Sequence, residues 1–351
     1  MLGSCDPSTE RASATETEEV PPLTKLRLRV VSVAVTAAIA TACLAAGTAA
    51  PVSADPRDFR GTWVLQEASS VEALNRHAPE IRRALGWNGV VGLSIRVPWR
   101  TLEPRKGNYN FKILQRAREI AGSKQLSVRF TAGRNTPRGR MGHTMTYNGS
   151  LTGGMGSGSI VPLPFGRDGG PNEPFERGWK RLVDKLVHWC KSHRVRLLHM
   201  SWPGLLWSEI AIFDQLKQQP GYSLKAAQKT HVRFMAYAMK KTNRRFYVEF
   251  ASSGYGVGKV WRPVWRHLMS KPAHRRVFIN SNYLSHTTTN LPDDAPPPPR
   301  GAQMIGPGNR FDWDRVYSKV RSMYGVYLEI YTPSFSGGTS DELRQEAARF
   351  H

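Results

Sequence analysis

Cysteine is scarce in this sequence, with 3 residues in 351, and two of them, Cys5 and Cys43, lie near the N-terminus. The rest of the chain holds Cys190 alone, so it can form no internal disulfide and must be stabilised by a packed core. Hydrophobic residues make up 40% of the chain, which is enough for such a core. This composition excludes a small disulfide-stapled scaffold and a disordered tail protein. Cys190 itself lies in an apolar helical pattern and is expected to be buried.

Several motifs that mark common enzyme classes are also missing. No Gly-x-Gly-x-x-Gly follows a predicted strand, which argues against a dinucleotide-binding open sheet. There is no His-Glu-x-x-His, and His188 and His193 have the wrong spacing for a metal-binding pair on one helix face. There is no Gly-x-Ser-x-Gly nucleophile elbow. The sequence therefore predicts neither a metal nor a cofactor.

Acidic residues are few, with 27 Asp and Glu against 50 Lys and Arg, and the net charge is +23. Such a balance is typical of proteins that bind polyanions. No nucleic-acid-binding motif accompanies the charge, so nucleic acid is not the expected partner. We expect instead an attraction to anionic cell-wall polymers or acidic glycans, which salt should weaken.

The N-terminal region predicts export. Lys25, Arg27 and Arg29 precede an apolar run from Val30 to about Gly47, and Val52-Ser53-Ala54 resembles a cleavage site. The run is rich in alanine and short for a stable membrane span, so cleavage is favoured over an uncleaved anchor. We therefore expect residues 1–54 to be a leader with a signal peptide of bacterial style, and the product to be secreted or associated with the cell surface. These residues hold four bases and five acids, so their removal changes the net charge from +23 to +24.

Residues 55–351 alternate between strand and helix patterns, which predicts one domain. Eight strands are expected, the seventh of them weak, and they are followed by helical stretches. The expected strands are Phe59–Glu67, Val90–Trp99, Leu126–Gly133, Val195–Pro203, Phe246–Ser252, Val277–Leu284, Ala302–Gly306 and Val326–Tyr331. The expected helices are Val71–Leu85, Phe111–Ala121, Trp179–Lys191, Ala226–Lys241, Trp261–Met269 and Trp313–Tyr324. Eight such units in about 300 residues predict an α/β fold, a single (β/α)8 TIM barrel.

One segment resembles a known family. Trp99–Pro104 reads Trp-Arg-Thr-Leu-Glu-Pro, and Gly107–Phe111 reads Gly-Asn-Tyr-Asn-Phe and opens a helix. This run is similar to one that follows strand 2 in (β/α)8-barrel glycoside hydrolases of the clan of retaining β-galactosidases and cellulases. The resemblance extends loosely from residue 58 onward and identifies no subfamily. It implies hydrolysis of O-glycosidic bonds by two carboxylates, one an acid/base and one a nucleophile.

The resemblance points to two glutamates. Its acid/base comes from the end of strand 4, where Glu209 is the nearby carboxylate. Trp202 and Trp207 lie shortly before that position in the sequence, and apolar surroundings favour the protonated form that a proton donor needs. Glu329 lies inside the last apolar strand, and alternation turns it towards the barrel interior, as a nucleophile requires. By our count this strand is the eighth, whereas the nucleophile of the clan lies on the seventh. If Ala302–Gly306 is a loop, the count becomes seven and Glu329 matches the clan.

Other acidic residues are weaker candidates. Glu249, in the fifth strand, is an alternative to Glu329 as the nucleophile by the same burial argument. Glu103, in Glu-Pro at a turn into a helix, is expected to be structural. Glu173 lies in Asn-Glu-Pro but follows a glycine-rich loop and not a strand, so it is interpreted as a chance match.

A carbohydrate substrate would need aromatic rings for stacking and polar groups for its hydroxyls. The candidates near predicted strand ends are Arg96, Trp99, Arg134, Trp202, Asn280, Asn282, Tyr283 and Tyr331. The alternative to a hydrolase is an exported, non-catalytic barrel that binds cell-wall or acidic polysaccharide through its basic surface.

Overall fold

The computed structural model describes residues 59–148, 158–200, 214–242, 247–251, 258–270, 277–285, 300–304, 306 and 311–350. All of them belong to one compact unit, Pro51–His351. Within these residues, no helix has both the length and the apolar character that crossing a membrane requires.

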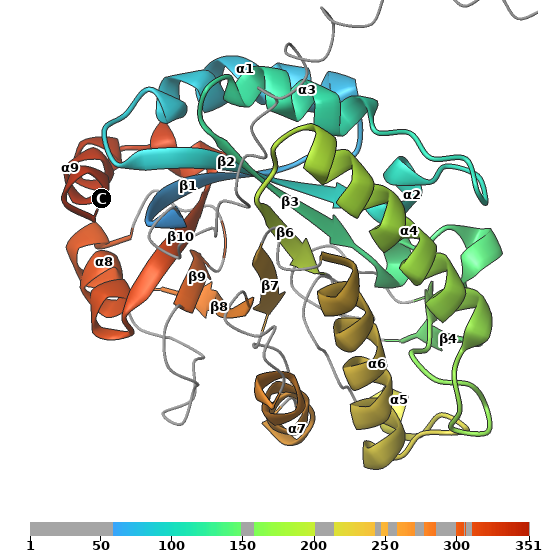
Figure 1. Ribbon diagram of the computed structural model, residues 1–351. Helices are drawn as coiled ribbons and strands as arrows, with labels where there is room; N and C mark the ends of the chain where they lie inside the picture. Colours follow the sequence, from blue (N-terminus) through green and yellow to red (C-terminus); the bar gives the residue numbers. More distant parts are fainter. Residues whose placement is uncertain are drawn as a thin grey trace, which may run out of the picture. The chain divides into compact units, whose positions relative to one another are not determined.

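Eight parallel strands form a closed barrel in the order β1-β2-β3-β6-β7-β8-β9-β10, and β10 pairs with β1. The strands are β1 (Gly61–Glu67), β2 (Val90–Pro98), β3 (Gln125–Thr131), β6 (Leu197–Met200), β7 (Tyr247–Ala251), β8 (Val277–Leu284), β9 (Arg300–Met304) and β10 (Gly325–Tyr331). Helices lie outside the ring of strands (Figure 1). They are α1 (Val71–Leu85), α2 (Trp99–Leu102), α3 (Lys112–Ala121), α4 (Glu173–Ser192), α5 (Asp214–Lys217), α6 (Leu224–Thr242), α7 (Gly258–Met269), α8 (Trp313–Ser322) and α9 (Ser340–Phe350). The predicted (β/α)8 fold is confirmed.

The outer helices form because each has a polar face and an apolar stripe. In α1, the Ser70 hydroxyl caps the N-terminus by accepting a hydrogen bond from the Ala73 N–H, 3.1 Å away. Leu74 and Ile81 of the same helix are fully buried. In α4, Pro174 occupies the first turn, where a missing N–H does no harm. Each helix thereby covers one side of the barrel.

All eight expected strands are present, including the weak seventh one, which begins two residues earlier than predicted as β9. The helix α9 and a hairpin of β4 (Thr144–Tyr147) and β5 (Ser159–Pro162) were not predicted. In α9 only Leu343, Ala347 and Phe350 carry the apolar stripe among many charges. The ring of Phe350 packs on Tyr317 of α8 at 5.4 Å between centroids, so a tertiary contact stabilises a helix with a weak local signal.

The barrel interior is divided into two layers. An apolar layer near the strand N-termini contains Phe59, Trp63, Leu197 and Tyr327, all of them buried. The Trp63 indole N–H donates to the Phe59 carbonyl at 3.1 Å, and its ring lies 5.0 Å from that of Tyr327. Charged and polar side chains fill the interior on the C-terminal side of this layer. The polar end is therefore the end at which barrels of this architecture bind their substrates.

Glu103 supports the loop that follows β2. Its buried carboxylate accepts hydrogen bonds from the Trp99 indole at 2.8 Å, the Gly107 N–H at 2.7 Å and the Arg140 guanidinium at 2.5 and 2.9 Å. Glu173, in contrast, begins α4 with a side chain that is 73% exposed. The structural interpretation of Glu103 fits these contacts, and Glu173 is an exposed residue at the start of an outer helix.

The two Glu-Pro positions give a matched test of stability. Glu103→Ala should lower the free energy of unfolding by about 3–5 kcal/mol, because it leaves the buried Arg140 charge without a partner. Glu173→Ala should cost less than about 1 kcal/mol, the contribution of an exposed acid in the first turn of a helix. Chemical denaturation of both variants measures the difference, and equal losses would contradict the assigned role of Glu103.

Candidate active site

The strand register places several polar side chains on the inner wall of the barrel. Glu329 of β10 is level with Trp63 of β1 and with Gln303 of β9. Side chains two residues apart on a strand share a face, so Tyr331 lies on the same wall nearer the C-terminal end. Figure 1 shows β9, β10, β1 and β2 side by side, and these strands supply much of the cluster.

Glu329 is fully buried and is held by three donors. The Tyr327 hydroxyl donates to one carboxylate oxygen at 2.5 Å, and the Ser94 hydroxyl donates to the same oxygen. The Arg129 guanidinium donates to the other oxygen at 2.5 Å, and both members of this ion pair are inaccessible to solvent. These contacts fix the orientation of the carboxylate, because charge-assisted hydrogen bonds are short and directional.

Arg96 and Gln303 link this pair to the mouth of the barrel. The Gln303 side-chain oxygen accepts hydrogen bonds from Arg96 and Arg129. The Gln303 amide also lies 3.3 Å from the Tyr331 hydroxyl, which is 3.4 Å from the Arg96 guanidinium. Two arginines, an amide and a phenol therefore form one connected polar network.

Glu67 closes the network on the solvent side. It ends β1 and pairs with Arg96 at 2.5 Å, and its side chain is 53% exposed. Glu67 was not predicted as a site residue, although alternation from Trp63 through Leu65 turns it inward. The network thus contains an exposed carboxylate at the mouth and a buried one beneath it.

His199 of β6 lies in the same interior and is fully buried. Loss of solvation holds the pKa of its imidazole well below the usual value, and the positive charge of Arg129 contributes in the same direction. The nearby Glu329 carboxylate opposes this shift without reversing it. His199 is therefore uncharged in the folded protein at neutral pH.

The predicted site residues have different placements. Arg96, Tyr331 and Glu329 meet in the interior network, and Asn280 of β8 is buried in the same barrel wall. Arg134 lies just beyond β3, in a short 3-10 helix, Gly133–Asn135. Trp99 is fully buried, with its indole bonded to Glu103 and its ring against Phe175 at 5.8 Å. A sugar ring has no access to it, which corrects the expectation that Trp99 stacks on substrate.

Other predicted residues lie outside the described part of the chain. They include the candidate acid/base Glu209 and the aromatic Trp202. For Asn282, Tyr283 and Glu249 only the backbone is described, in β8 and β7. The register places Glu249 level with His199 on the neighbouring strand.

The strand count decides one open point. Because Arg300–Met304 is a true strand, Glu329 belongs to the eighth strand of the barrel and not to the seventh. The seventh strand, β9, carries Gln303 at the position level with Glu329. The position of Glu329 therefore departs from the pattern of the clan that the sequence resembles.

Comparison with known proteins supports the fold. No family model and no curated protein matches the sequence. The chain is similar to the catalytic domain of a β-amylase from Paenibacillus polymyxa, with a TM-score of 0.52, 8% identity, and coverage of 83% of this chain and 98% of that one. This likeness shows a shared barrel fold, since identity is too low to carry an activity.

Two weaker likenesses involve other carbohydrate-active enzymes. A D-allulose 3-epimerase from Methylomonas sp. has a TM-score of 0.47 at 11% identity, covering 83% of this chain and 96% of that one. A family 10 endo-β-1,4-xylanase from Gloeophyllum trabeum has a TM-score of 0.44 at 11% identity, covering 78% and 84%. The structures that resemble this chain thus include TIM-barrel glycoside hydrolases and an epimerase.

The buried ion pair should show strong coupling in a double-mutant cycle. Arg129→Met alone should cost about 3–5 kcal/mol of unfolding free energy, because the Glu329 charge stays buried without its cation. The double variant with Glu329→Gln should recover much of that loss. Denaturant titration of the four proteins gives the coupling energy, and additive effects of the two substitutions would contradict a direct pair.

His199 makes stability depend on pH. Its pKa is lower in the folded protein than the ordinary value of about 6.5 in the unfolded chain, so the unfolded chain takes up the proton first as pH falls. The free energy of unfolding should therefore decrease below about pH 6.5. His199→Gln should make this decrease smaller, whereas the exposed control His188→Gln should not; a decrease unchanged in His199→Gln would refute this contribution.

Proposed function

We propose that the protein is a glycoside hydrolase that cleaves O-glycosidic bonds with retention of configuration. Glu329 is the nucleophile and Glu209 the acid/base in this proposal. The carboxylate of Glu329 attacks the anomeric carbon, and the bond from that carbon to the leaving oxygen breaks. Glu209 gives its proton to the leaving oxygen, and a water activated by Glu209 then hydrolyses the glycosyl ester on Glu329.

One observation carries the proposal. A carboxylate lies inside the polar half of a (β/α)8 barrel, oriented by Arg129, Ser94 and Tyr327. Such a group is costly to bury, and a folded chain keeps it there when its contacts compensate the cost. A nucleophile needs a fixed direction, and three donors from three different strands supply it.

The upper network suits the binding of a sugar. Arg96, Gln303 and Tyr331 offer donors and acceptors near the barrel mouth, where hydroxyl groups need polar partners. The exposed Glu67 carboxylate adds an acceptor at the entrance. In the same proposal the N-terminal leader directs the chain out of the cytoplasm, where polymeric glycans are accessible.

The second candidate is a non-catalytic barrel that binds glycans. Gln303 stands at the seventh-strand position level with Glu329, and an amide cannot act as the nucleophile. The contacts of Glu329 with three donors also suit a purely structural carboxylate. These two observations favour the non-catalytic candidate, so an experiment must separate it from the hydrolase.

A mechanism-based label separates them in the unmodified protein. A panel of aryl glycosides first identifies a cleaved sugar, and the matching 2-deoxy-2-fluoro glycoside then traps the ester of a retaining enzyme. Peptide mass spectrometry should place the label on Glu329. A label on Glu249 or Glu67 would contradict the assignment of the nucleophile.

Glu329→Gln provides a second, independent test. It should reduce kcat by at least about a thousandfold, because an amide cannot form the ester intermediate. Its thermal unfolding is compared with that of Arg129→Met, which disturbs the same ion pair but keeps the carboxylate. No cleavage of any glycoside by the wild-type protein would favour the non-catalytic alternative.

A further inference from the structure

A second polar region lies on the outer wall of the barrel, along α3 and α4. Two cavities open there, of about 550 Å³ and about 460 Å³. Gly107 and Tyr109, just before α3, line the first cavity, and Arg118 and Gly122, at the end of α3, line the second. The opposite side of each cavity is lined by residues of α4 or residues directly after it. The two cavities therefore follow the same pair of helices.

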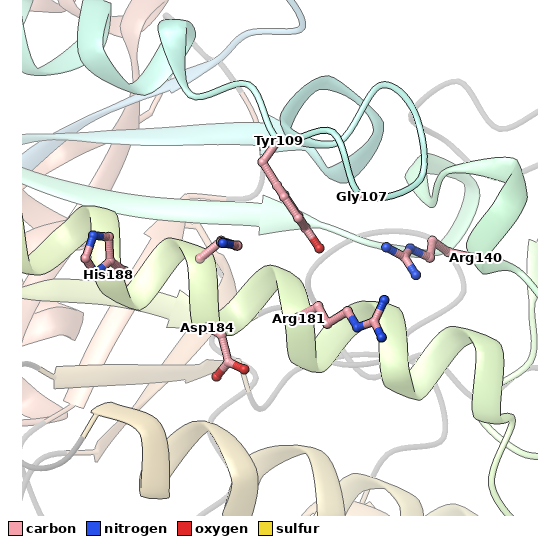
Figure 2. Close-up of a pocket in the computed structure, with 7 residues that line it drawn as sticks. Gly107, Tyr109, Arg140, Arg181, Asp184 and His188 are labelled. Carbon is pink, nitrogen blue, oxygen red and sulfur yellow. The ribbon is translucent and has the colours of Figure 1, made fainter. Parts of the chain in front are cut away.

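The first cavity is lined by cations of α4. Arg181, Lys185 and His188 are exposed and recur at the spacing of one helix face. Figure 2 shows Tyr109 extending from the opposite loop towards α4, with its hydroxyl end directed at the helix. That hydroxyl is buried and lies close to the Arg140 guanidinium. Burial raises the pKa of Tyr109, so it stays protonated and can donate to an acceptor in the cavity.

The carboxylate in this cavity is already neutralised. Asp184 lies 3.1 Å from the Lys241 ammonium and accepts a hydrogen bond from the Tyr237 hydroxyl at 2.8 Å. Arg140 is likewise paired with Glu103. No described carboxylate pairs with Arg181 or Lys185, so these two charges remain for a ligand.

The second cavity is more basic. Arg118, Lys124, Arg194 and Arg196 line it, with His193, and no described acidic residue does. A simpler explanation of this cluster is helix capping. Cations favour the C-termini of α3 and α4, where the two helix dipoles contribute about −0.5 charge each. Three of these cations, Arg118, Lys124 and Arg194, already exceed that by about two positive charges. Helix capping therefore explains only part of the cluster, although Arg118 does donate to the Gly122 and Lys124 carbonyls.

We propose that the two cavities, from Arg181 to Arg196, together form a docking track for an acidic polysaccharide, distinct from the barrel interior. The part of α4 from Arg181 to Ser192 spans about 16 Å, enough for several sugar units in an extended chain. The arginine guanidinium forms bidentate hydrogen bonds with the oxygens of carboxylate and sulfate groups. Tyr109 is half-buried, and no Trp or Phe lines either cavity among the described residues, which disfavours a stacking platform for nucleic-acid bases.

The test measures binding of the full chain to fluorescent oligosaccharides of equal length, namely polygalacturonate, a heparin fragment and neutral dextran, and to a fluorescent oligonucleotide. Arg181→Gln/Lys185→Gln/Arg194→Gln removes three track charges. Arg82→Gln/Lys225→Gln/Lys229→Gln removes three exposed charges of α1 and α6 and is the matched control. Polygalacturonate or heparin should bind in a salt-dependent manner and dextran should not; the two probes distinguish a carboxylate from a sulfate ligand.

The track variant should lose about tenfold in affinity for the acidic probe, as expected for three partly exposed ion pairs, and the control less than about twofold. Equal losses in both variants would overturn the track, because net charge alone would then explain binding. Tighter binding of an oligonucleotide than of either acidic saccharide would also overturn it.

Cleavage of uncharged aryl glycosides, assayed on the same samples, should be unchanged in the track variant. That readout separates this proposal from the proposed hydrolase activity.

Discussion

The buried Arg129–Glu329 pair constrains the whole barrel interior. Two opposite charges inaccessible to solvent are tolerated when they meet at close range and further hydrogen bonds compensate their lost solvation. Glu329 achieves this with Ser94 and Tyr327, and Arg129 reaches Gln303. Because domains are stable by only about 5–15 kcal/mol, an unpaired charge at this position would remove a large share of that margin. The strands must therefore hold their register for the pair to exist.

The layering of the interior follows from this constraint. Trp63 and Tyr327 fill the barrel below the pair with aromatic surface, which excludes water from one side. Arg96, Gln303 and Tyr331 continue the polar network towards the mouth. In this arrangement an aromatic layer packs below Glu329 and a polar network lies between it and the barrel mouth. The fixed carboxylate can therefore contribute to a reaction as well as to stability. The two basic cavities along α3 and α4 lie on the outer wall and hold part of the positive charge of the chain.

The sequence predicted the fold well because strand alternation and helical stripes are local signals. Even the weak segment after Pro292–Pro299 contained a strand, which the small residues Gly301 and Ala302 made hard to recognise. The helix α9 was missed, since its stability depends on contact with Tyr317.

Glu329 was predicted to face inward by alternation alone, and it does. Its partner Arg129 and the bridging Gln303 could not be predicted, because they depend on the register between distant strands. For Trp99 the prediction was wrong. Its place at a strand end predicted stacking on a substrate, but its indole donates a hydrogen bond to the buried Glu103 carboxylate.

We propose that the interior carboxylate network cleaves glycosidic bonds. A crystal structure with a bound sugar product would test it most directly, through the separation between the carboxyl groups of Glu209 and Glu329. The account predicts about 5–5.5 Å, the separation of a retaining pair, with the anomeric carbon between the two groups. A separation beyond about 10 Å, or a sugar bound away from Glu329, would contradict it.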